Sequence, residues 1–218
     1  MPMKNNREYR DMTLDIVKRD EAVEDPDQRE MRVAGYASTF NEPYVLYSDD
    51  ELVYREQVDA NAFADTDMSD VIMQYDHEGR VFARISNNTL RVEPDEKGLF
   101  IEADLGGTEL GRQLYEEIDG GYTNKMSFGF IVSDDEETRS RAEDGRVDIL
   151  RTITGVSKLF DVSAVSIPAN NATSISVRNL TDGVIEQIRA ERLEAERIET
   201  ERRRAIVKAK AIMSGGNK

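Results

Sequence analysis

The chain has 218 residues, a formal net charge of −15 at pH 7, one His and no Cys. That length suits one domain with an appendage and is ample for a sizeable buried core. Zero Cys excludes disulfides, thiolate zinc sites, iron–sulfur clusters and cysteine nucleophiles, and one His excludes multi-His metal sites.

Charge divides the chain into regions. Residues 183–218 carry a net charge of +3, so residues 1–182 carry −18. We expect an N-terminal arm with a first strand over residues 1–30, a main domain over 31–180 and a charged helical tail over 181–218. The acidic body disfavours nonspecific nucleic-acid binding. No stretch reaches the roughly 20 apolar residues of a membrane span, and the N-terminus lacks a secretory signal, so a soluble, cytoplasmic-type protein is expected.

Short strands are predicted through the first half of the main domain, where β-branched and aromatic runs are separated by turn residues. They cover residues 31–40, 71–75, 81–85, 89–92 and 99–105. Such close spacing favours antiparallel meanders over βαβ units. A short helical turn is also expected at residues 60–64.

One internal helix is predicted next. Thr108 can cap its N-terminus, and a pair of glycines at its other end stops it. Leu110, Leu114 and Ile118 form an apolar stripe at i, i+4 and i+8.

Two longer strands are predicted after this helix, over residues 125–132 and 151–165, and a last short strand over 174–177. Residues 134–148 are charged and show no periodicity. We therefore expect an exposed, mobile loop there.

Residues 183–213 are predicted to form a long helix, because no Gly or Pro follows Gly183 until Gly215. Its apolar stripe is thin and broken. Either the helix is solvated and stabilised by Glu/Arg pairs at i, i+4, or it forms a coiled coil or docks on a scaffold.

Ser127 is the first candidate for chemistry. Strand alternation places Met126, Phe128 and Phe130 on one face, and Ser127 and Gly129 on the other. The bulky face anchors the strand, while the bare glycine lets another group approach beside Ser127. A purely structural alternative is that Ser127 and Gly129 simply fit beneath a packed helix.

His77 is the second candidate. It follows a hydrophobic strand at a turn, where a side chain is held by the core and still reaches solvent, as a general base requires. The alternative is that a lone histidine at the surface has no chemical role.

Asp161 is the third candidate, because it interrupts an apolar strand, where a carboxylate is costly unless paired. Two explanations remain open. Asp161 forms a local ion pair, with Lys158 or Arg151 as the partner, or it orients a catalytic group.

These segments occur with other short motifs in a distinctive order. The motifs are Gly35 to Asn41, Asp59 to Phe63, Tyr75 to His77 with Gly79 and Arg80, Glu96 to Leu99, Leu110 to Arg112, Met126 to Phe130, Asp161 to Ser163 and Pro168 to Asn170. From about Arg32 to Arg178, their order and spacing resemble the capsid maturation (prohead) proteases of tailed bacteriophages. These serine peptidases are distantly similar to the herpesvirus assemblins.

The resemblance implies that Ser127 is the nucleophile and His77 the general base. It places Asp161 where the family commonly has a Glu that orients the histidine. The shorter Asp is a departure that works if its strand lies closer, and Glu78 and Asp76 are the competing carboxylates. Analogy with the assemblins places the oxyanion-hole backbone at Ala169 and Asn170.

The fold that this resemblance implies is mainly β with flanking helices (α+β): a herpesvirus-protease-like antiparallel β-barrel of about seven strands, with a long charged C-terminal helix. Assemblins act as dimers, so a homodimer is an option, with the helix of Leu110, Leu114 and Ile118 as its candidate interface. No metal or other cofactor is expected.

The implied function is a serine endopeptidase that cuts the scaffold protein, or the scaffold-like N-terminal part of the major capsid protein, inside the immature capsid in the host cytoplasm. It is expected to cleave itself as well, and the tail would then be a packaging or removable segment. The alternative is a non-enzymatic scaffold or assembly chaperone with a vestigial protease barrel. A nucleic-acid-binding barrel is disfavoured by the charge of the body.

Overall fold

The structure, a computed structural model, describes residues 7–12, 17–18 and 31–165, together with residues 190, 193–194, 197–202 and 204 of the tail. The chain divides into two compact units, residues 1–177 and 178–218. Among the described residues, no helix is long and apolar enough to cross a membrane.

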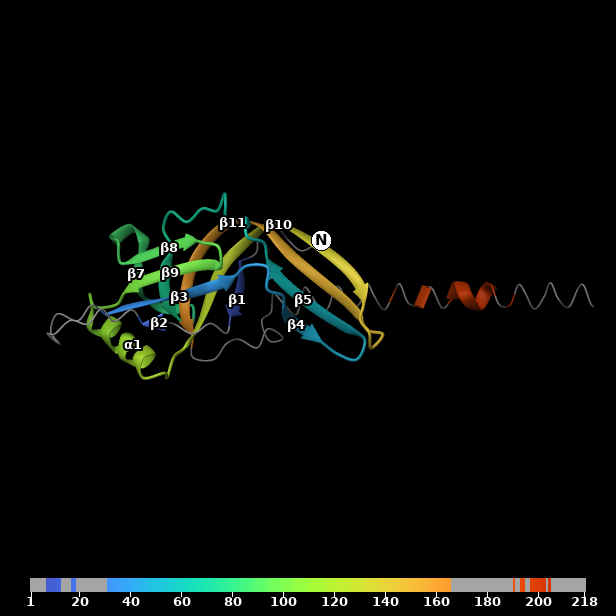
Figure 1. The fold of residues 1–218 in the computed structure, drawn as a ribbon, viewed down its shortest axis with the longest axis horizontal. Coiled ribbons are helices and arrows are strands. Elements are labelled where there is room, and N and C mark those ends of the chain that lie inside the picture. The colour runs from blue at the N-terminus through green and yellow to red at the C-terminus, as the bar shows by residue number, and fades with distance from the viewer. Residues whose placement is uncertain are drawn as a thin grey trace, which may run out of the picture. The chain divides into compact units, whose positions relative to one another are not determined.

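Strands dominate the first unit and form two sheets (Figure 1). The larger sheet has the order β1-β10-β11-β5-β4, and β6 and β7 extend it from β11. Its strands are β1 (Glu8–Met12), β4 (Tyr44–Ser48), β5 (Leu52–Val58), β6 (Ile72–Tyr75), β7 (Glu78–Arg84), β10 (Lys125–Arg141) and β11 (Val147–Val165).

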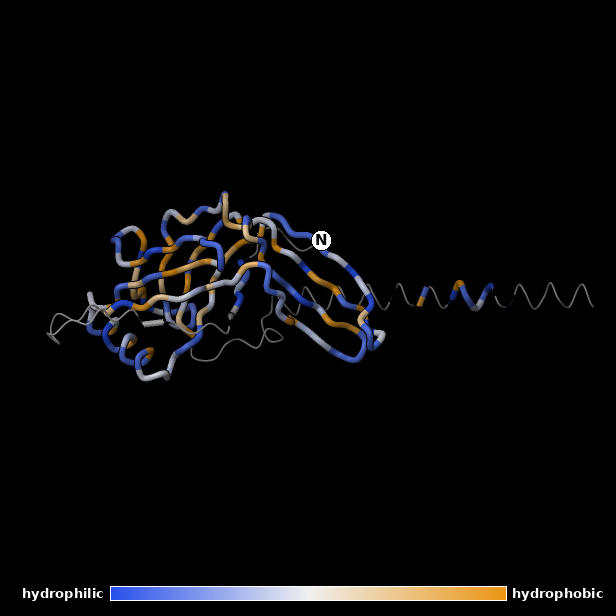
Figure 2. The backbone as a smooth tube through the Cα atoms, viewed as in Figure 1, coloured by the Kyte–Doolittle hydropathy of each residue, from blue (hydrophilic) through white to orange (hydrophobic). Residues whose placement is uncertain are grey.

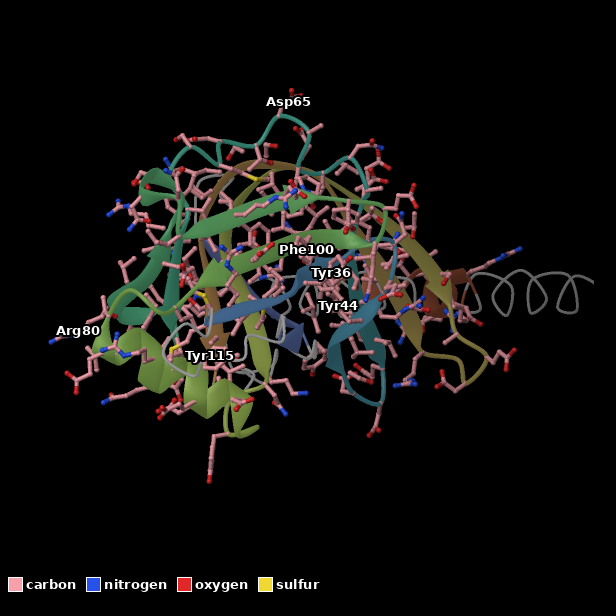
Figure 3. All side chains as sticks on the ribbon, turned by 60° about the vertical axis from the view of Figure 1, so that its left-hand side comes forward. Tyr36, Tyr44, Asp65, Arg80, Phe100 and Tyr115 are labelled. Atoms are coloured by element: carbon pink, nitrogen blue, oxygen red, sulfur yellow. The ribbon has the colours of Figure 1, made fainter. Side chains whose placement is uncertain are left out.

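The smaller sheet has the order β2-β3-β9-β8. Its strands are β2 (Val17–Lys18), β3 (Arg32–Thr39), β8 (Leu90–Pro94) and β9 (Gly98–Asp104), and the short 3-10 helix η2 (Ile85–Asn87) precedes β8. Tyr36 of β3 and Phe100 of β9 lie side by side on this sheet, with ring centroids 5.6 Å apart (Figure 3).

The two sheets do not close, so the expectation of a barrel is wrong, whereas the expectation of a mainly β protein is confirmed. Closure requires each edge strand to pair with a neighbour. One edge of β11 pairs with β10, and the other edge is shared by two strands. Along Val147–Ile153 it pairs in parallel with β5, and along Asp161–Ala164 it pairs in parallel with β6. Between the end of β3 and the end of β5, the described residues form only an isolated bridge, from Phe40 to Val58.

The predicted loop at residues 134–148 is also wrong, because most of it belongs to the long β10–β11 hairpin. The outer half of β10 is hydrophilic (Figure 2) and lacks the alternation that marks a strand. Polar pairs across strands stabilise it instead. Tyr54 donates a hydrogen bond to Glu137 over 2.8 Å, and Arg151 contacts Asp135 at 3.1 Å.

One hydrophobic core joins residues of both sheets and helix α1 (Glu109–Asp119). The prediction of this helix is confirmed, including its cap, since the Thr108 side chain accepts a hydrogen bond from the Gly111 N–H. Leu114 and Ile118 are buried in the core of their own chain, and Leu110 is 37% exposed. Most of the apolar stripe of α1 therefore packs inside its own chain and is not available as a dimer interface. The homodimer itself stays a prediction.

In the tail, the described residues between 190 and 204 are helical and exposed, and Arg197 pairs with Glu194 and Glu201. The remainder of the predicted 183–213 helix, and the predicted strand at 174–177, lie outside the described residues. The long helix and the domain boundary at residue 181 stay predictions.

Candidate active site

The turn between β6 and β7 holds His77 in an uncommon backbone conformation. Tyr75 pairs with Glu78, so Asp76 and His77 are the two turn residues, with φ of 48° and 59°. Positive φ at both positions is the pattern of a type I′ hairpin turn, and for residues other than Gly it costs roughly 1–3 kcal/mol each. The Asp76 N–H donates to the Ala164 carbonyl over 2.9 Å, which fixes the turn against β11.

Strand β10 presents Ser127 on the face predicted from its alternation. Met126, Phe128 and Phe130 are fully buried in the core, and the Phe128 and Phe130 rings stack with centroids 4.5 Å apart. On the other face, Ser127 lies opposite Ser163 of β11. The packed apolar face thereby fixes the direction of the serine hydroxyl.

The structure brings Ser127, His77 and Asp161 together in one hydrogen-bonded chain. The distance from His77 Nε2 to Ser127 Oγ is 2.5 Å, and that from His77 Nδ1 to Asp161 Oδ2 is 2.5 Å. The carboxylate fixes the tautomer with hydrogen on Nδ1, so Nε2 carries the lone pair that accepts the serine proton. This is the connectivity of a nucleophile, a base and an orienting acid.

Asp161 is fully buried, and its partners differ from the local ones suggested by the sequence. Besides His77, it accepts hydrogen bonds from Ser163 at 2.8 Å and from Arg7. Neither predicted local partner contacts it, because Lys158 pairs with Asp67 and Arg151 pairs with Glu56, Glu8 and Asp135. The carboxylate at Nδ1 is therefore that of Asp161 rather than that of Asp76 or Glu78.

The electrostatics of Asp161 favour its charged form. Burial by itself raises the pKa of its carboxyl group, but the hydrogen bond and charge of His77, the hydrogen bond from Ser163 and the charge of Arg7 outweigh burial. The pKa of Asp161 therefore lies below its ordinary value. In its ionised form the carboxylate can stabilise an imidazolium formed during proton transfer.

Gly129 makes room for this carboxylate. It lies opposite Asp161 in the β10–β11 register, and a Cβ built on it would overlap Asp161 Oδ1 and come within 2.9 Å of the Arg7 guanidinium. The small residue beside Ser127 thus has a steric role at the site, as its place on the serine face suggested.

Sequence reasoning missed the N-terminal segment of the site. Arg7 contacts Asp161, and the Tyr9 ring meets the His77 ring edge-on with centroids 4.5 Å apart. Strand β1 pairs antiparallel with β10, next to Ser127. A first strand is expected within residues 1–30, but a strand of five residues carries no signal that it pairs with β10 beside Ser127.

The predicted oxyanion-hole residues Ala169 and Asn170 lie outside the described residues. Within the described part of the chain, no cluster of three or more His, Asp or Glu side chains is arranged to hold a metal ion.

Comparison with known families gave a match that covers most of the chain. The model of the caudovirus prohead serine protease family matches residues 17–185. The chain belongs to this family. A search of curated proteins and a search of solved structures found no match.

Family membership agrees with the resemblance carried by the motifs, and it implies serine protease activity. The match includes His77, Ser127 and Asp161, but it assigns no catalytic residue. The roles of these three side chains stay predictions, which the geometry makes testable.

Proposed function

We propose that the protein is the serine endopeptidase of phage capsid maturation. It cuts the scaffold protein, or the scaffold-like N-terminal part of the major capsid protein, inside the immature capsid in the host cytoplasm, and it also cleaves itself. The observation that carries this proposal is the chain of contacts from Asp161 through His77 to Ser127, in a member of a prohead serine protease family.

In this mechanism Ser127 Oγ attacks the carbonyl carbon of the scissile bond while His77 Nε2 takes the hydroxyl proton. His77 then donates that proton to the leaving amine, and water releases the acyl group in a second, equivalent step. Asp161 holds the imidazole in position and stabilises its charged form. Positioned proton transfer of this kind contributes roughly 10²–10⁴-fold to the rate.

The test is co-expression with the major capsid protein, followed by mass spectrometry of that protein. Ser127→Ala and His77→Ala should each abolish its cleavage while leaving the circular dichroism spectrum unchanged. Ser157→Ala is the matched control, because Ser157 is an exposed serine of β11 away from the His77 contact. Processing that persists in both active-site variants would refute the assignment and favour the non-enzymatic scaffold.

A further inference from the structure

Strand β1 lies over the candidate active site in the position of an extended peptide. It runs antiparallel to β10, with Asp11 opposite Ser127 and Arg10 opposite Phe128. Adding a strand to a sheet edge is a common way to bind a peptide, because main-chain hydrogen bonds align it and alternate side chains enter pockets. Strand β1 also lies before residues 17–185, the part matched by the family model.

The carbonyl group of Arg10 lies at the candidate nucleophile. Its oxygen is 3.0 Å from Ser127 Oγ, and Ser127 is fully buried in this arrangement. A hydroxyl has a single hydrogen. In the structure the Ser127 hydroxyl donates to this carbonyl oxygen. For attack, the hydrogen turns to His77 and the neighbouring carbonyl carbon of Arg10 comes to face Oγ in place of the oxygen.

The Arg10 side chain enters a buried pocket on the other face of the sheet. Its guanidinium is 1% exposed and forms two hydrogen bonds with the fully buried Glu56, of 2.5 and 2.9 Å. Paired hydrogen bonds between a guanidinium and a carboxylate recognise arginine with defined geometry.

Residues other than Arg10 also hold the Glu56 carboxylate in position. The Tyr44 hydroxyl (Tyr44 is labelled in Figure 3) donates to Glu56 over 2.6 Å, and Arg151 donates to Glu56 over 2.8 Å. Glu56 therefore keeps one cation when Arg10 is absent, so the carboxylate is positioned before a second guanidinium arrives.

A second residue of β1 uses the same pocket. Glu8 lies two residues before Arg10, on the same face of the strand, and accepts hydrogen bonds from Arg151 at 3.1 and 3.4 Å. Glu8 also contacts the Arg10 guanidinium. The pocket thus matches a Glu-x-Arg sequence, with Glu56 facing the arginine and Arg151 facing the glutamate.

We propose that β1 is bound as a substrate, and that the protein cuts after arginine in a Glu-x-Arg segment, beginning with its own Arg10–Asp11 bond. This inference rests on the proposed peptidase function and adds its specificity. Ser127 Oγ bonds to the carbonyl carbon of Arg10, the bond from that carbon to the Asp11 nitrogen breaks, and His77 passes the serine proton to that nitrogen. Water then hydrolyses the ester, releasing residues 1–10 with a carboxylate at Arg10 and a chain that begins at Asp11.

The first experiment follows the intact mass of the purified full chain over time, for the unaltered protein and for Ser127→Ala. The expected result is loss of residues 1–10 from the unaltered protein alone. An N-terminus that stays intact, or one cut at another bond, would overturn the inference.

The second experiment tests the pocket. Arg10→Leu should slow the cut on the order of 10³-fold, because it leaves the polar groups of the pocket without their partner. Arg91→Leu is the matched control, since Arg91 is an exposed arginine of β8 and its loss should change nothing. Glu56→Asp keeps the charge and withdraws the carboxylate by one methylene, so it should slow the cut after Arg10 while a folded protein remains. Equal rates in Arg10→Leu, Glu56→Asp and the control would refute recognition of arginine.

A third measurement separates this inference from the proposed function. Co-expressed capsid protein is analysed for cleavage, and a fluorophosphonate is used to label Ser127. Cleavage and labelling together with an uncut Arg10–Asp11 bond would overturn the role of β1 and leave the peptidase in place. Faster labelling of Arg10→Glu is expected than of unaltered protein whose Arg10–Asp11 bond is still intact, because the introduced charge repels Glu56 and displaces β1 from Ser127. An unchanged labelling rate would show that β1 does not occupy the site.

Discussion

Asp161 and Glu56 are both completely buried carboxylates, and their surroundings differ in kind. Asp161 contacts one guanidinium, that of Arg7, together with the titratable imidazole of His77 and the hydroxyl of Ser163. Glu56 contacts two guanidinium groups, those of Arg10 and Arg151, and the hydroxyl of Tyr44. His77 can gain and lose a proton during a reaction, whereas the guanidinium partners of Glu56 keep their charge, so the Glu56 cluster suits recognition and stability.

The pKa values follow the same division. Burial alone raises the pKa of Glu56, but the charges and hydrogen bonds of Arg10, Arg151 and Tyr44 outweigh burial and lower the pKa to about 2. Burial, together with the nearby charge of Glu56, raises the pKa of Tyr44 well above its ordinary value, so Tyr44 stays a hydrogen-bond donor. Substitutions at the two carboxylates should accordingly affect different properties.

Asp161→Asn should show the largest effect, a loss of about 10⁴-fold in peptidase activity, because an amide no longer fixes the tautomer of His77. The free energy of unfolding should change far less. Cleavage rates of the capsid protein and urea denaturation measure the two quantities. Near-normal activity would move the orienting role to Glu78 or Asp76.

In the Ser127→Ala background, which keeps residues 1–10 attached, Glu56→Gln should lower the free energy of unfolding by about 3–5 kcal/mol. The change removes the buried anion shared by Arg10 and Arg151 and leaves them only Glu8 and Asp135 as carboxylate partners. The exposed pair of Glu93 and Arg91 offers a matched comparison, and Glu93→Gln should cost about 1 kcal/mol or less. Urea denaturation of both variants is the measurement. Equal losses would mean that the Glu56 cluster contributes no more than a surface ion pair.

Gly129→Ala should reduce activity by about 10²-fold, because its methyl group displaces Asp161 and a small misplacement at an active site is costly. Gly107→Ala is the control, since a Cβ there meets nothing within 4 Å. Capsid-protein cleavage is measured for both. An active Gly129→Ala variant would show that the carboxylate position tolerates a shift.

Acid should destabilise the protein through Glu56. Folding lowers the pKa of Glu56, so its carboxylate stabilises the folded state in full at pH values above its ordinary pKa of 4.5. This contribution to the free energy of unfolding is lost as the pH falls from there through about 2. The free energy of unfolding should therefore fall by up to about 1.4 kcal/mol per pH unit in this window. Urea denaturation between pH 5 and pH 2.5 measures the slope, which should be smaller in Glu56→Gln. Parallel curves for the two proteins would contradict this assignment.

Truncation after Arg178 should have the smallest effect on activity, because every residue of both buried clusters precedes it. Incorporation into proheads should decrease if the tail docks on the scaffold. Particle composition, measured by mass spectrometry of purified proheads, tests this. Normal incorporation would argue against a docking role for residues 183–213.

Much of the site followed from short-range patterns. The alternation of β10 predicted which face carries Ser127, because successive side chains of a strand point to opposite sides. Asp161 was marked by its position within an apolar strand, where an unpaired charge is too costly. Helix α1 followed from its cap and its apolar spacing.

The Glu56 pocket and the outer β10–β11 hairpin carried a weaker signal. Glu56 shares one face of β5 with Leu52, Tyr54 and Val58, but its direct neighbours Arg55 and Gln57 are polar, and this obscures the alternation. Its burial depends on Arg151, 95 residues later, and on Arg10, 46 residues earlier.

By itself, the sequence determined the strand-rich fold class, the place of the single His77 at a turn and the face that carries Ser127, because these depend on neighbours along the chain. Only the tertiary structure decided that the sheets stay open, that Asp161 rather than Asp76 or Glu78 meets His77, and that β1 lies against Ser127. These features depend on which distant strands pair, and β11 pairs with β10, β5 and β6 along different parts of its length.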